Sequence, residues 1–305
     1  MTKVFIDGSA GTTGLRIADR LKERKDIELI TLPDAERKDP ERRKEAVNLA
    51  DICFLCLPDE AAKETVAMVE NPDTAVIDTS TAHRVSPDFV YGFPEITGRD
   101  RIKNSKRIAN PGCHATGFIS LVFPLVNQGI IKPDARLCCF SLTGYSGGGK
   151  KMIAEYESSE RSALLGAPRQ YGLSQQHKHL KEMAAVTGLL NPPVFCPVVG
   201  DFYSGMEVTV TLNKSDFKAS LSEIKEVYKS FYTGKVVSFS DEHEAGFLSA
   251  GILSGKDCLT VSAFGNNDRI ILVSRFDNLG KGASGAAVQN MNIVMGIDET
   301  EGLVL

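Results

Sequence analysis

A glycine-rich turn near the N-terminus constrains the fold of this chain more than any other feature. The apolar run from Val4 to Asp7 predicts a strand, and GSAGTTG, Gly8 to Gly14, follows it at once. Apolar residues then recur at helical spacing, at Leu15, Ala18 and Leu21. A strand, a glycine turn and a helix in this order are typical of dinucleotide binding, because glycines let backbone N–H groups approach a pyrophosphate at the helix N-terminus.

The same turn supplies the first group of candidate cofactor contacts. Its spacing is GxxGxxG, which departs from the GxGxxG fingerprint, so a glycine turn without a ligand is the alternative interpretation. The strand-turn-helix context favours the cofactor. The predicted contacts in this turn are Gly8, Ser9, Gly11, Thr12, Thr13 and Gly14.

Further apolar runs place this turn in a doubly wound α/β domain of the Rossmann type. The runs span 27–32, 52–57 and 75–78, and the segments between them are long enough for crossover helices. Their near-continuous hydrophobicity is typical of parallel strands that are buried on both faces.

The pattern changes after Cys113 and predicts a second domain of the α+β class. Val208, Val210 and Leu212 alternate with threonines, as in a half-solvated antiparallel strand. Other expected strands are 136–143, 236–239, 258–264 and 270–276. The expected helices are 118–125, 221–231 and 283–294, the last with its apolar residues on one face.

Composition and charge exclude several classes of protein. The net charge is −4 and both signs are mixed along the chain, which argues against nucleic-acid binding. No stretch approaches the roughly 18 to 20 apolar residues of a membrane span, and MTKVFIDG enters a strand pattern and not a signal peptide. The 7 cysteines are odd in number and lie mostly in apolar runs, which suits core residues in a reducing compartment. We therefore expect a soluble, cytoplasmic protein.

Charged residues after the second predicted strand bear on the choice between NAD and NADP. An acidic residue there typically holds a ribose hydroxyl, whereas basic residues accept a 2′-phosphate. Asp34 is followed by Arg37 and Lys38, with Arg42 and Arg43 close behind, so the sequence favours NADP. The alternative for the charged run 36–45 is a solvated surface helix.

The segment NPGCHATG, Asn110 to Gly117, contains the candidate nucleophile. Cys113 follows a Pro-Gly turn at the expected start of a helix, where the N-terminus lowers the pKa of a thiol and offers N–H groups to an oxyanion. A buried structural cysteine is the usual alternative, and it describes Cys53 and Cys56 better than Cys113. The position of Cys113 predicts covalent catalysis.

The segment QQHKHLKEM supplies candidates for the acid/base partner that such a thiolate needs. His177 and His179 could instead be zinc ligands or surface histidines. No cysteine or carboxylate cluster with ligand spacing lies nearby, so the sequence predicts no metal site.

Two further segments are candidate anion sites. SGGGKK, Ser146 to Lys151, has the composition of an anion loop and could place Lys150 on a substrate phosphate, with a flexible linker as the alternative. Arg84 lies just beyond the strand end at Asp78, at the carboxyl edge of the predicted parallel sheet. It is a candidate carboxylate or phosphate anchor, weighed against an ordinary surface arginine.

Four motifs together, GSAGTTG, NPGCHAT, the HKH segment and DNLGKGASGAAVQNMN, resemble those of the short-form (type 2) N-acetyl-γ-glutamyl-phosphate reductases. The resemblance covers essentially the whole chain. It implies a two-domain fold like that of glyceraldehyde-3-phosphate and aspartate-semialdehyde dehydrogenases, with the C-terminal helix returning to the nucleotide domain. The expected domains are 1–113 with 280–305 for the dinucleotide, and 114–279 for catalysis, substrate binding and oligomerisation. A homo-oligomer, dimer or tetramer, is also implied.

The resemblance implies reduction of N-acetyl-γ-glutamyl phosphate to N-acetyl-glutamate 5-semialdehyde with NADPH and release of phosphate, in arginine biosynthesis. By motif position, Cys113 is the expected nucleophile and His177 the expected acid/base. The segment HKHLKE departs from the family's HRHxPE at the middle arginine and the proline, which bears on substrate contacts. The remaining expected site residues are Arg84, Asn110, Lys150, Tyr171, His179 and Glu182 for the substrate, and Pro58, Asn278 and Gly282 for the cofactor.

Other functions stay open at this stage. In the expected mechanism the thiolate displaces phosphate to give a thioester, which hydride reduces to a thiohemiacetal and then to the aldehyde. Reductases of aspartyl phosphate or carrier-bound aminoadipyl phosphate would use the same chemistry. A short-chain-type reductase is disfavoured, because no tyrosine is followed four residues later by a lysine. A non-catalytic NADP-sensing protein would need the glycine turn but neither Cys113 nor His177.

Overall fold

The computed structural model describes residues 1–305, which divide into two compact units. Met1–Gly112 and Ala283–Leu303 form the first unit, and Cys113–Gly282 and Val304–Leu305 form the second. The chain therefore enters the second unit at Cys113 and returns to the first after Gly282.

The first unit contains a six-stranded sheet in the order β2-β1-β3-β4-β6-β5, with every pair parallel. The predicted α/β domain is thus confirmed, although the second and third strands end two residues earlier than expected. The chain leaves β1 for β2 on one side and returns to β3 on the other, which creates a topological switch point between β1 and β3. The strands are β1 (Thr2–Asp7), β2 (Ile27–Ile30), β3 (Ile52–Leu55), β4 (Ala75–Asp78), β5 (Val90–Tyr91) and β6 (Arg107–Ala109).

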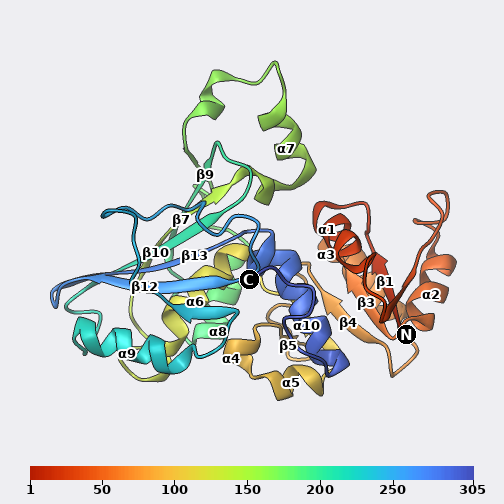
Figure 1. The fold of residues 1–305 in the computed structure, drawn as a ribbon, viewed down its shortest axis with the longest axis horizontal. Helices are drawn as coiled ribbons and strands as arrows, with labels where there is room; N and C mark the ends of the chain where they lie inside the picture. The colour runs from red at the N-terminus through yellow and green to blue at the C-terminus, as the bar shows by residue number, and fades with distance from the viewer. The chain divides into compact units, whose positions relative to one another are not determined.

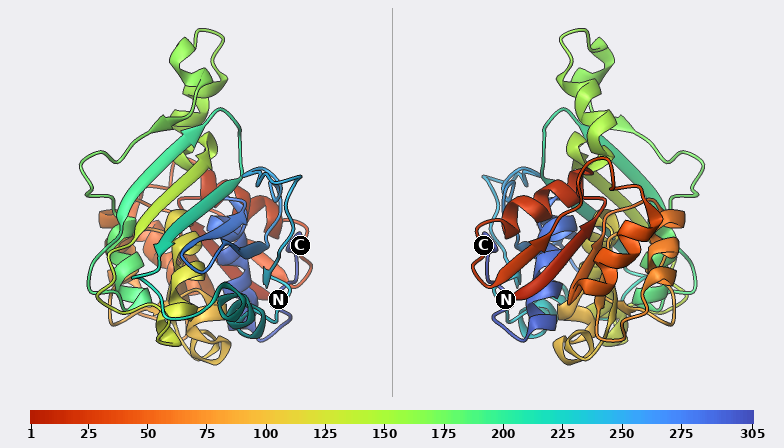
Figure 2. Two further views of the ribbon diagram at one scale, coloured as in Figure 1. Left: turned by 90° about the vertical axis from the view of Figure 1, so that its left-hand side faces the viewer. Right: turned by 90° about the vertical axis from the view of Figure 1, so that its right-hand side faces the viewer.

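Helices cover both faces of this sheet, as its buried strands require. Apolar residues of α1 and α10 pack on one face, and those of α2 and α3 pack on the other. The right-hand view of Figure 2 looks onto β1 and β2, with α1 to one side and α2 and α3 to the other. The helices are α1 (Thr12–Leu21), α2 (Pro40–Leu49), α3 (Asp59–Met68), α4 (Pro94–Thr97), α5 (Arg99–Lys103) and α10 (Gly285–Met295).

The helix α10 is buried on all sides. Its predicted apolar residues Ala287, Met291 and Val294 pack together against the parallel sheet, and every residue from Gly285 to Ile293 is buried. The amide nitrogen of the buried Asn290 is hydrogen-bonded, because its Nδ2 donates to the carbonyl of Gly92 and to Oδ1 of Asn110, whereas its Oδ1 has no partner. A helix buried on all sides accepts polar residues where each can be hydrogen-bonded.

The second unit contains a seven-stranded mixed sheet in the order β11-β12-β13-β10-β7-β9-β8. The alternating strand β10 pairs antiparallel with β13 and β7, and its valines are buried while its threonines are partly exposed, as predicted. The strands are β7 (Cys138–Gly144), β8 (Arg169–Gln170), β9 (Val194–Gly200), β10 (Met206–Asn213), β11 (Val237–Phe239), β12 (Leu259–Gly265) and β13 (Arg269–Phe276).

A central helix, α6, packs against β10 and β13 of this sheet. Pro124 lies inside α6 and has no N–H for the carbonyl of Ser120, but the hydroxyl of Tyr232 donates to that carbonyl at 2.8 Å. The helix therefore keeps its buried acceptors satisfied. The helices of this unit are α6 (Cys113–Asn127), α7 (Gly149–Glu157), α8 (His179–Thr187) and α9 (Leu221–Phe231). No helix of the structure has both the length and the apolar character needed to cross a bilayer.

The segment SGGGKK forms a short 3₁₀ turn and the start of a helix. Its first residues lie in a 3₁₀ turn, Tyr145–Gly148, and Gly149 begins α7. Figure 1 shows α7 and the chain after it projecting beyond the ends of β7 and β9. Lys150 is exposed in the first turn of this projecting helix.

Candidate active site

The glycine turn lies at the switch point of the parallel sheet. Gly8 has φ +86°, and a Cβ atom there would collide with the carbonyl of Cys56 at the end of β3. Only glycine therefore fits this position. The N–H of Gly11 closes the turn by donating to the carbonyl of Gly8 at 2.9 Å, and α1 begins at Thr12.

A cavity of about 390 Å³ lies beside this turn, within the range of small-ligand sites. It brings together four of the predicted cofactor contacts, Gly8, Ser9, Arg37 and Lys38. Gly11, Thr12, Thr13 and Gly14 continue the turn into α1, and Pro58 caps α3. The wall is otherwise mostly apolar and includes Ala18, Leu29, Ile30, Leu32, Leu57 and Ala61.

Two charged groups of the cavity already have partners. Arg43 is buried, and its guanidinium donates to Oδ2 of Asp7 at 2.9 Å and also binds Thr65. The alternative interpretation of 36–45, a solvated surface helix, does not hold at Arg43, whose contact with Asp7 joins α2 to the end of β1. Asp34 forms an exposed ion pair with Arg37 at 2.7 Å, whereas Lys38 has no carboxylate within ion-pair distance.

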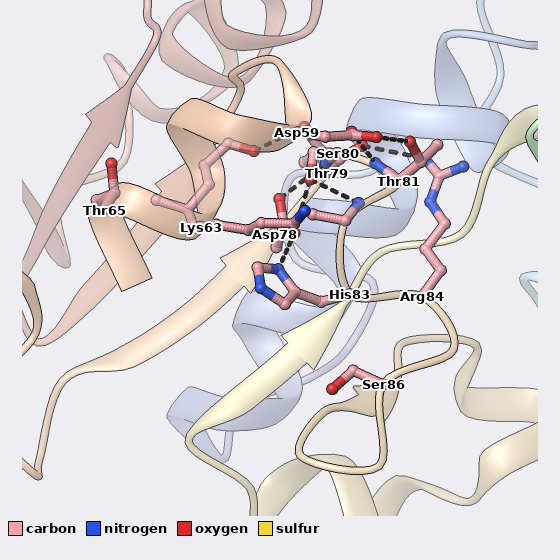
Figure 3. Close-up of polar contacts among 12 residues, drawn as sticks. Asp59, Lys63, Thr65, Asp78, Thr79, Ser80, Thr81, His83, Arg84 and Ser86 are labelled. Carbon is pink, nitrogen blue, oxygen red and sulfur yellow. Dashed lines mark hydrogen bonds and ion pairs between the residues drawn. The ribbon is translucent and has the colours of Figure 1, made fainter. Parts of the chain in front are cut away.

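The loop after β4 holds a second polar network (Figure 3). Asp78 is fully buried, and its Oδ2 atom lies 2.7 Å from Nδ1 of His83 and accepts the hydroxyl of Ser80 at 2.8 Å. Figure 3 shows the imidazole turned back toward Asp78, whereas the side chain of Arg84 leaves the loop in another direction. Asp78 and His83 were not predicted as site residues, yet their contact holds the loop that carries Arg84.

Arg84 and Asn110 lie together at the carboxyl edge of the sheet. Arg84 Nε donates to the carbonyl of Asn110, and a terminal nitrogen donates to that of Thr79, both at 3.0 Å. The side chain of Asn110 is buried, donates to the carbonyl of Ala283 and accepts from Asn290. Asn110 therefore joins β6 to α10 and supports Arg84 through its carbonyl.

Cys113 is the first residue of α6 and is half-buried. A Cβ atom on Gly282 would lie 3.0 Å from its Cβ atom, so the glycine leaves room at the thiol. Burial raises the pKa of Cys53 and raises that of Cys56 to about 12, which makes both poor nucleophiles. The expectation that most cysteines are core residues was wrong, since only Cys53 and Cys139 are fully buried.

The residue after the nucleophile, His114, lies at the centre of a cluster of rings that the sequence did not predict. Its Nδ1 atom lies 2.7 Å from Oγ of Ser141, and its Nε2 atom lies 2.6 Å from the hydroxyl of Tyr171. Burial lowers the pKa of His114 to about 3, and the proximity of a second titratable ring, His177, acts in the same direction. The ring is therefore neutral at ordinary pH.

The predicted histidines meet around His114. The rings of His177 and His179 each lie 5.5 Å from it and 4.7 Å from each other. The N–H of His179 donates to Nδ1 of His177 at 3.2 Å, so the neutral His177 ring carries its proton on Nε2. Glu182 is buried one turn further along α8, 3.8 Å from Nε2 of His179.

Two predicted contacts of the second unit lie outside this cluster. Lys150 is exposed on α7. Asn278 is buried after β13, where its Oδ1 accepts the N–H of Gly205 and its Nδ2 donates to Oγ of Ser146, both at 3.0 Å. The amide of Asn278 thus fixes the start of the 3₁₀ turn before α7.

A parallel nucleotide-type sheet and a mixed sheet whose first helix opens with a cysteine define the class of the semialdehyde dehydrogenases, and family comparison agrees. Residues 3–105 match "Semialdehyde dehydrogenase, NAD binding domain", and residues 113–278 match "Semialdehyde dehydrogenase, dimerisation domain". An aspartate semialdehyde dehydrogenase II from Vibrio cholerae shares the fold, with a TM-score of 0.72 at 17% identity over 97% of this chain and 98% of its own.

Sequence relatives narrow this class further. An N-acetyl-gamma-glutamyl-phosphate reductase 2 from Nostoc sp. is 43% identical over 99% of both chains. The reductase of that name from Burkholderia ambifaria is 42% identical over 96% of both, and the one from Brucella suis is 44% identical over 96% of this chain and 99% of its own. The chain belongs to the N-acetyl-γ-glutamyl-phosphate reductase family, and its first unit is the nicotinamide cofactor domain.

Proposed function

We propose that this chain reduces N-acetyl-γ-glutamyl phosphate to N-acetyl-glutamate 5-semialdehyde, with release of phosphate, as a step of arginine biosynthesis. The observation that carries the proposal is the placement of Cys113 at the start of α6, beside Gly282 and next in the chain to the centre of the histidine cluster. Relatives of 42–44% identity are reductases named for this substrate.

The proposed chemistry begins at Cys113. Its thiolate attacks the acyl carbon, an S–C bond forms, and the C–O bond to phosphate breaks with its electron pair on the leaving phosphate, which takes a proton from solvent. The N–H groups at the start of α6 are proposed to stabilise the oxyanion of this addition. The nicotinamide cofactor supplies a hydride when bound. Collapse of the resulting thiohemiacetal oxyanion breaks the C–S bond, releases the aldehyde and returns the thiolate.

We assign His177 the role of donor at the substrate oxygen. Since its Nδ1 accepts the N–H of His179, the neutral ring carries its single N–H on Nε2, and we assign this group to the substrate oxygen. A neutral imidazole at a helix N-terminus is a good hydrogen-bond donor, because the helix disfavours its protonated form. His177 thus stabilises negative charge on the carbonyl oxygen as it develops.

Other residues are proposed to bind the rest of the substrate. Arg84 is held at the carboxyl edge of the sheet by the carbonyls of Asn110 and Thr79, and its guanidinium is proposed to bind a carboxylate or phosphate of the substrate. Tyr171, His179 and Glu182 line the cluster around His114. Lys150 and Asn278 remain proposed contacts, the first to substrate and the second to cofactor.

We propose NADP(H) as the cofactor. The cavity beside Gly8 and Ser9 fits a nucleotide, because a glycine cradle and a helix N-terminus meet its phosphates and apolar residues line its wall. Lys38 lies in this wall without a carboxylate partner, and Arg37 holds Asp34, the group that would otherwise favour a ribose hydroxyl.

The charge on Lys38 predicts a measurable preference. We expect kcat/KM for NADPH to exceed that for NADH by about 100-fold, and Lys38→Ser to reduce this ratio about tenfold, as loss of one charge-assisted contact would. The measurement is kcat/KM with each cofactor. Lys25→Ser, which removes an exposed lysine outside the cavity, is the matched control and keeps the ratio. A wild-type ratio near one would contradict the proposal.

The open face of the second sheet supports a proposed homo-oligomer. Phe140, Val194 and Ile271 are 44%, 59% and 40% exposed on its strands, and the matching family domain is named for dimerisation. Burying such apolar side chains against a second copy is favourable. The free thiols of all seven cysteines support a reducing compartment such as the cytoplasm.

The proposed activity is tested in the reverse direction. We expect phosphate-dependent reduction of NADP with N-acetyl-glutamate 5-semialdehyde, at a kcat/KM at least about 100-fold above that with aspartate semialdehyde, because a site built for one acyl group loses several contacts with the other. Absorbance at the reduced nicotinamide band, with and without phosphate, provides the measurement. Equal rates with both aldehydes would overturn the substrate, and activity with neither would overturn the enzyme.

A further inference from the structure

A chain of two hydrogen bonds in the second unit is centred on His114, the residue that follows the nucleophile. It links Ser141 on β7, His114 on α6 and Tyr171 after β8, with heavy-atom distances of 2.7 Å and 2.6 Å. Ser141 is completely buried and His114 nearly so. The mechanism described above uses neither Ser141 nor His114.

The direction of this chain follows from the number of hydrogens. A neutral imidazole has one N–H and one lone pair, so it accepts on one side and donates on the other. His114 Nδ1 is the sole hydrogen-bond partner of Ser141 Oγ. If Nδ1–H donated to Ser141, the serine hydroxyl hydrogen would be buried without an acceptor, which folded proteins avoid.

The opposite direction gives the hydrogens of both Ser141 and His114 an acceptor. Ser141 O–H donates to Nδ1 of His114, and Nε2–H of His114 donates to the oxygen of Tyr171. The hydroxyl hydrogen of Tyr171 is then left to donate to another group. The direction of donation along these two hydrogen bonds can reverse only if the proton of His114 moves from one ring nitrogen to the other. Ser141 therefore determines that the hydroxyl of Tyr171 accepts from His114 and donates elsewhere.

We propose that Ser141 and His114 are positioning residues that direct the phenolic hydrogen of Tyr171 toward the substrate bound at Cys113. This role rests on the proposed reductase function. The geometry places Tyr171 in the cluster beside the nucleophile, since its hydroxyl binds His114, the residue after Cys113, and its ring lies 6.2 Å from that of His177. Burial and the charge of Cys113 raise the pKa of Tyr171, so its hydroxyl is protonated at ordinary pH. His114 keeps a single N–H there, because its pKa is far below neutrality.

A double-mutant cycle separates positioning from packing. We expect Tyr171→Phe to lower kcat about 30-fold and His114→Phe about tenfold, with KM changed less than about threefold. In the Tyr171→Phe background, His114→Phe should change kcat less than about twofold, because the hydroxyl it positions is gone. If His114 only fills the core, the two losses will multiply, and the proposal is overturned.

Ser141 provides a milder variant with a matched control. Ser141→Ala leaves His114 and Tyr171 in place but removes the group that sets the direction, so kcat should fall at least about threefold. Ser274→Ala removes a serine hydroxyl that is equally buried, on β13, and has no hydrogen-bond partner, so it should leave kcat unchanged. Equal rates for the two variants would contradict the proposal.

The tautomer of His114 gives a readout that needs no activity. Imidazole ¹H–¹⁵N spectra of the wild-type protein should show the proton of His114 on Nε2, with His114→Phe identifying the signal. A proton on Nδ1 would overturn the positioning role even in an active enzyme. If the wild type has the Nε2–H tautomer but no phosphate-dependent activity, the proposed function fails and the hydrogen-bond chain stands.

Discussion

Cys113→Ser is expected to lower kcat/KM about 10⁴-fold or more, because the serine hydroxyl is a far weaker nucleophile than the thiolate that forms the thioester. A loss of this size corresponds to about 5.5 kcal/mol of transition-state stabilisation, far beyond what the small change in packing at a half-buried site would cause. The measurement is kcat/KM for the reverse reaction, with protein concentration checked by absorbance and folding by circular dichroism.

A matched cysteine controls for the substitution itself. Cys258 is half-buried like Cys113 but precedes β12, and burial raises the pKa of its thiol. Cys258→Ser should therefore keep kcat/KM within about twofold of the wild type. Mass spectrometry adds a second readout, since acyl phosphate without cofactor should acylate the peptide that contains Cys113. Retention of more than about a tenth of the activity in Cys113→Ser would exclude covalent catalysis at this residue.

The fold was predictable from sequence in segments whose apolar residues follow one regular spacing. The strand at Val4 is apolar on both faces, and β10 alternates at period two, so each sheet could be assigned from its own pattern. The apolar spacing at Leu221 likewise predicted α9. These patterns depend only on how many faces of an element are buried.

Prediction failed where polar residues are buried through partners distant in sequence. Arg43 resembles any residue of a charged surface run, and only its contact with Asp7, 36 positions earlier, explains its burial. Asn290 in α10 depends in the same way on Gly92, 198 positions earlier. Periodicity reports burial from apolar residues alone, so it describes such an element as half-exposed.

The candidate site shows the same division. Cys113 was predictable because a local Pro-Gly turn and a helix start are visible in the sequence. The glycine turn was predictable for the same reason, since it lies between a visible strand and a visible helix. His114, in contrast, reads as one more residue of a buried helix, since its partners Ser141 and Tyr171 are 27 and 57 positions away. The available signal was a polar ring directly after the nucleophile in an otherwise apolar helix, which calls for buried partners.

His177 is expected to act through the position of its Nε2–H group, and two substitutions distinguish this role from proton carriage. The side-chain amide of glutamine can place an N–H group close to the position of Nε2, whereas that of asparagine lies nearer to Nδ1. We therefore expect His177→Asn to lower kcat by about 100- to 1000-fold, the loss of one preorganised donor at an oxyanion. His177→Gln should retain at least about tenfold more activity than His177→Asn.

The comparison separates the two roles because the glutamine and asparagine side chains carry the same amide group and differ only in where they place it. Neither amide titrates near neutral pH, so a residue that must accept and release a proton would be lost equally in both variants. His243→Asn, at an exposed histidine of the second unit, controls for the loss of an imidazole and should leave kcat unchanged. The readout is kcat at saturating substrate, with KM measured in parallel. Equal losses of kcat in the two His177 variants would assign proton transfer to this residue. They would contradict the proposal that it acts as a neutral hydrogen-bond donor.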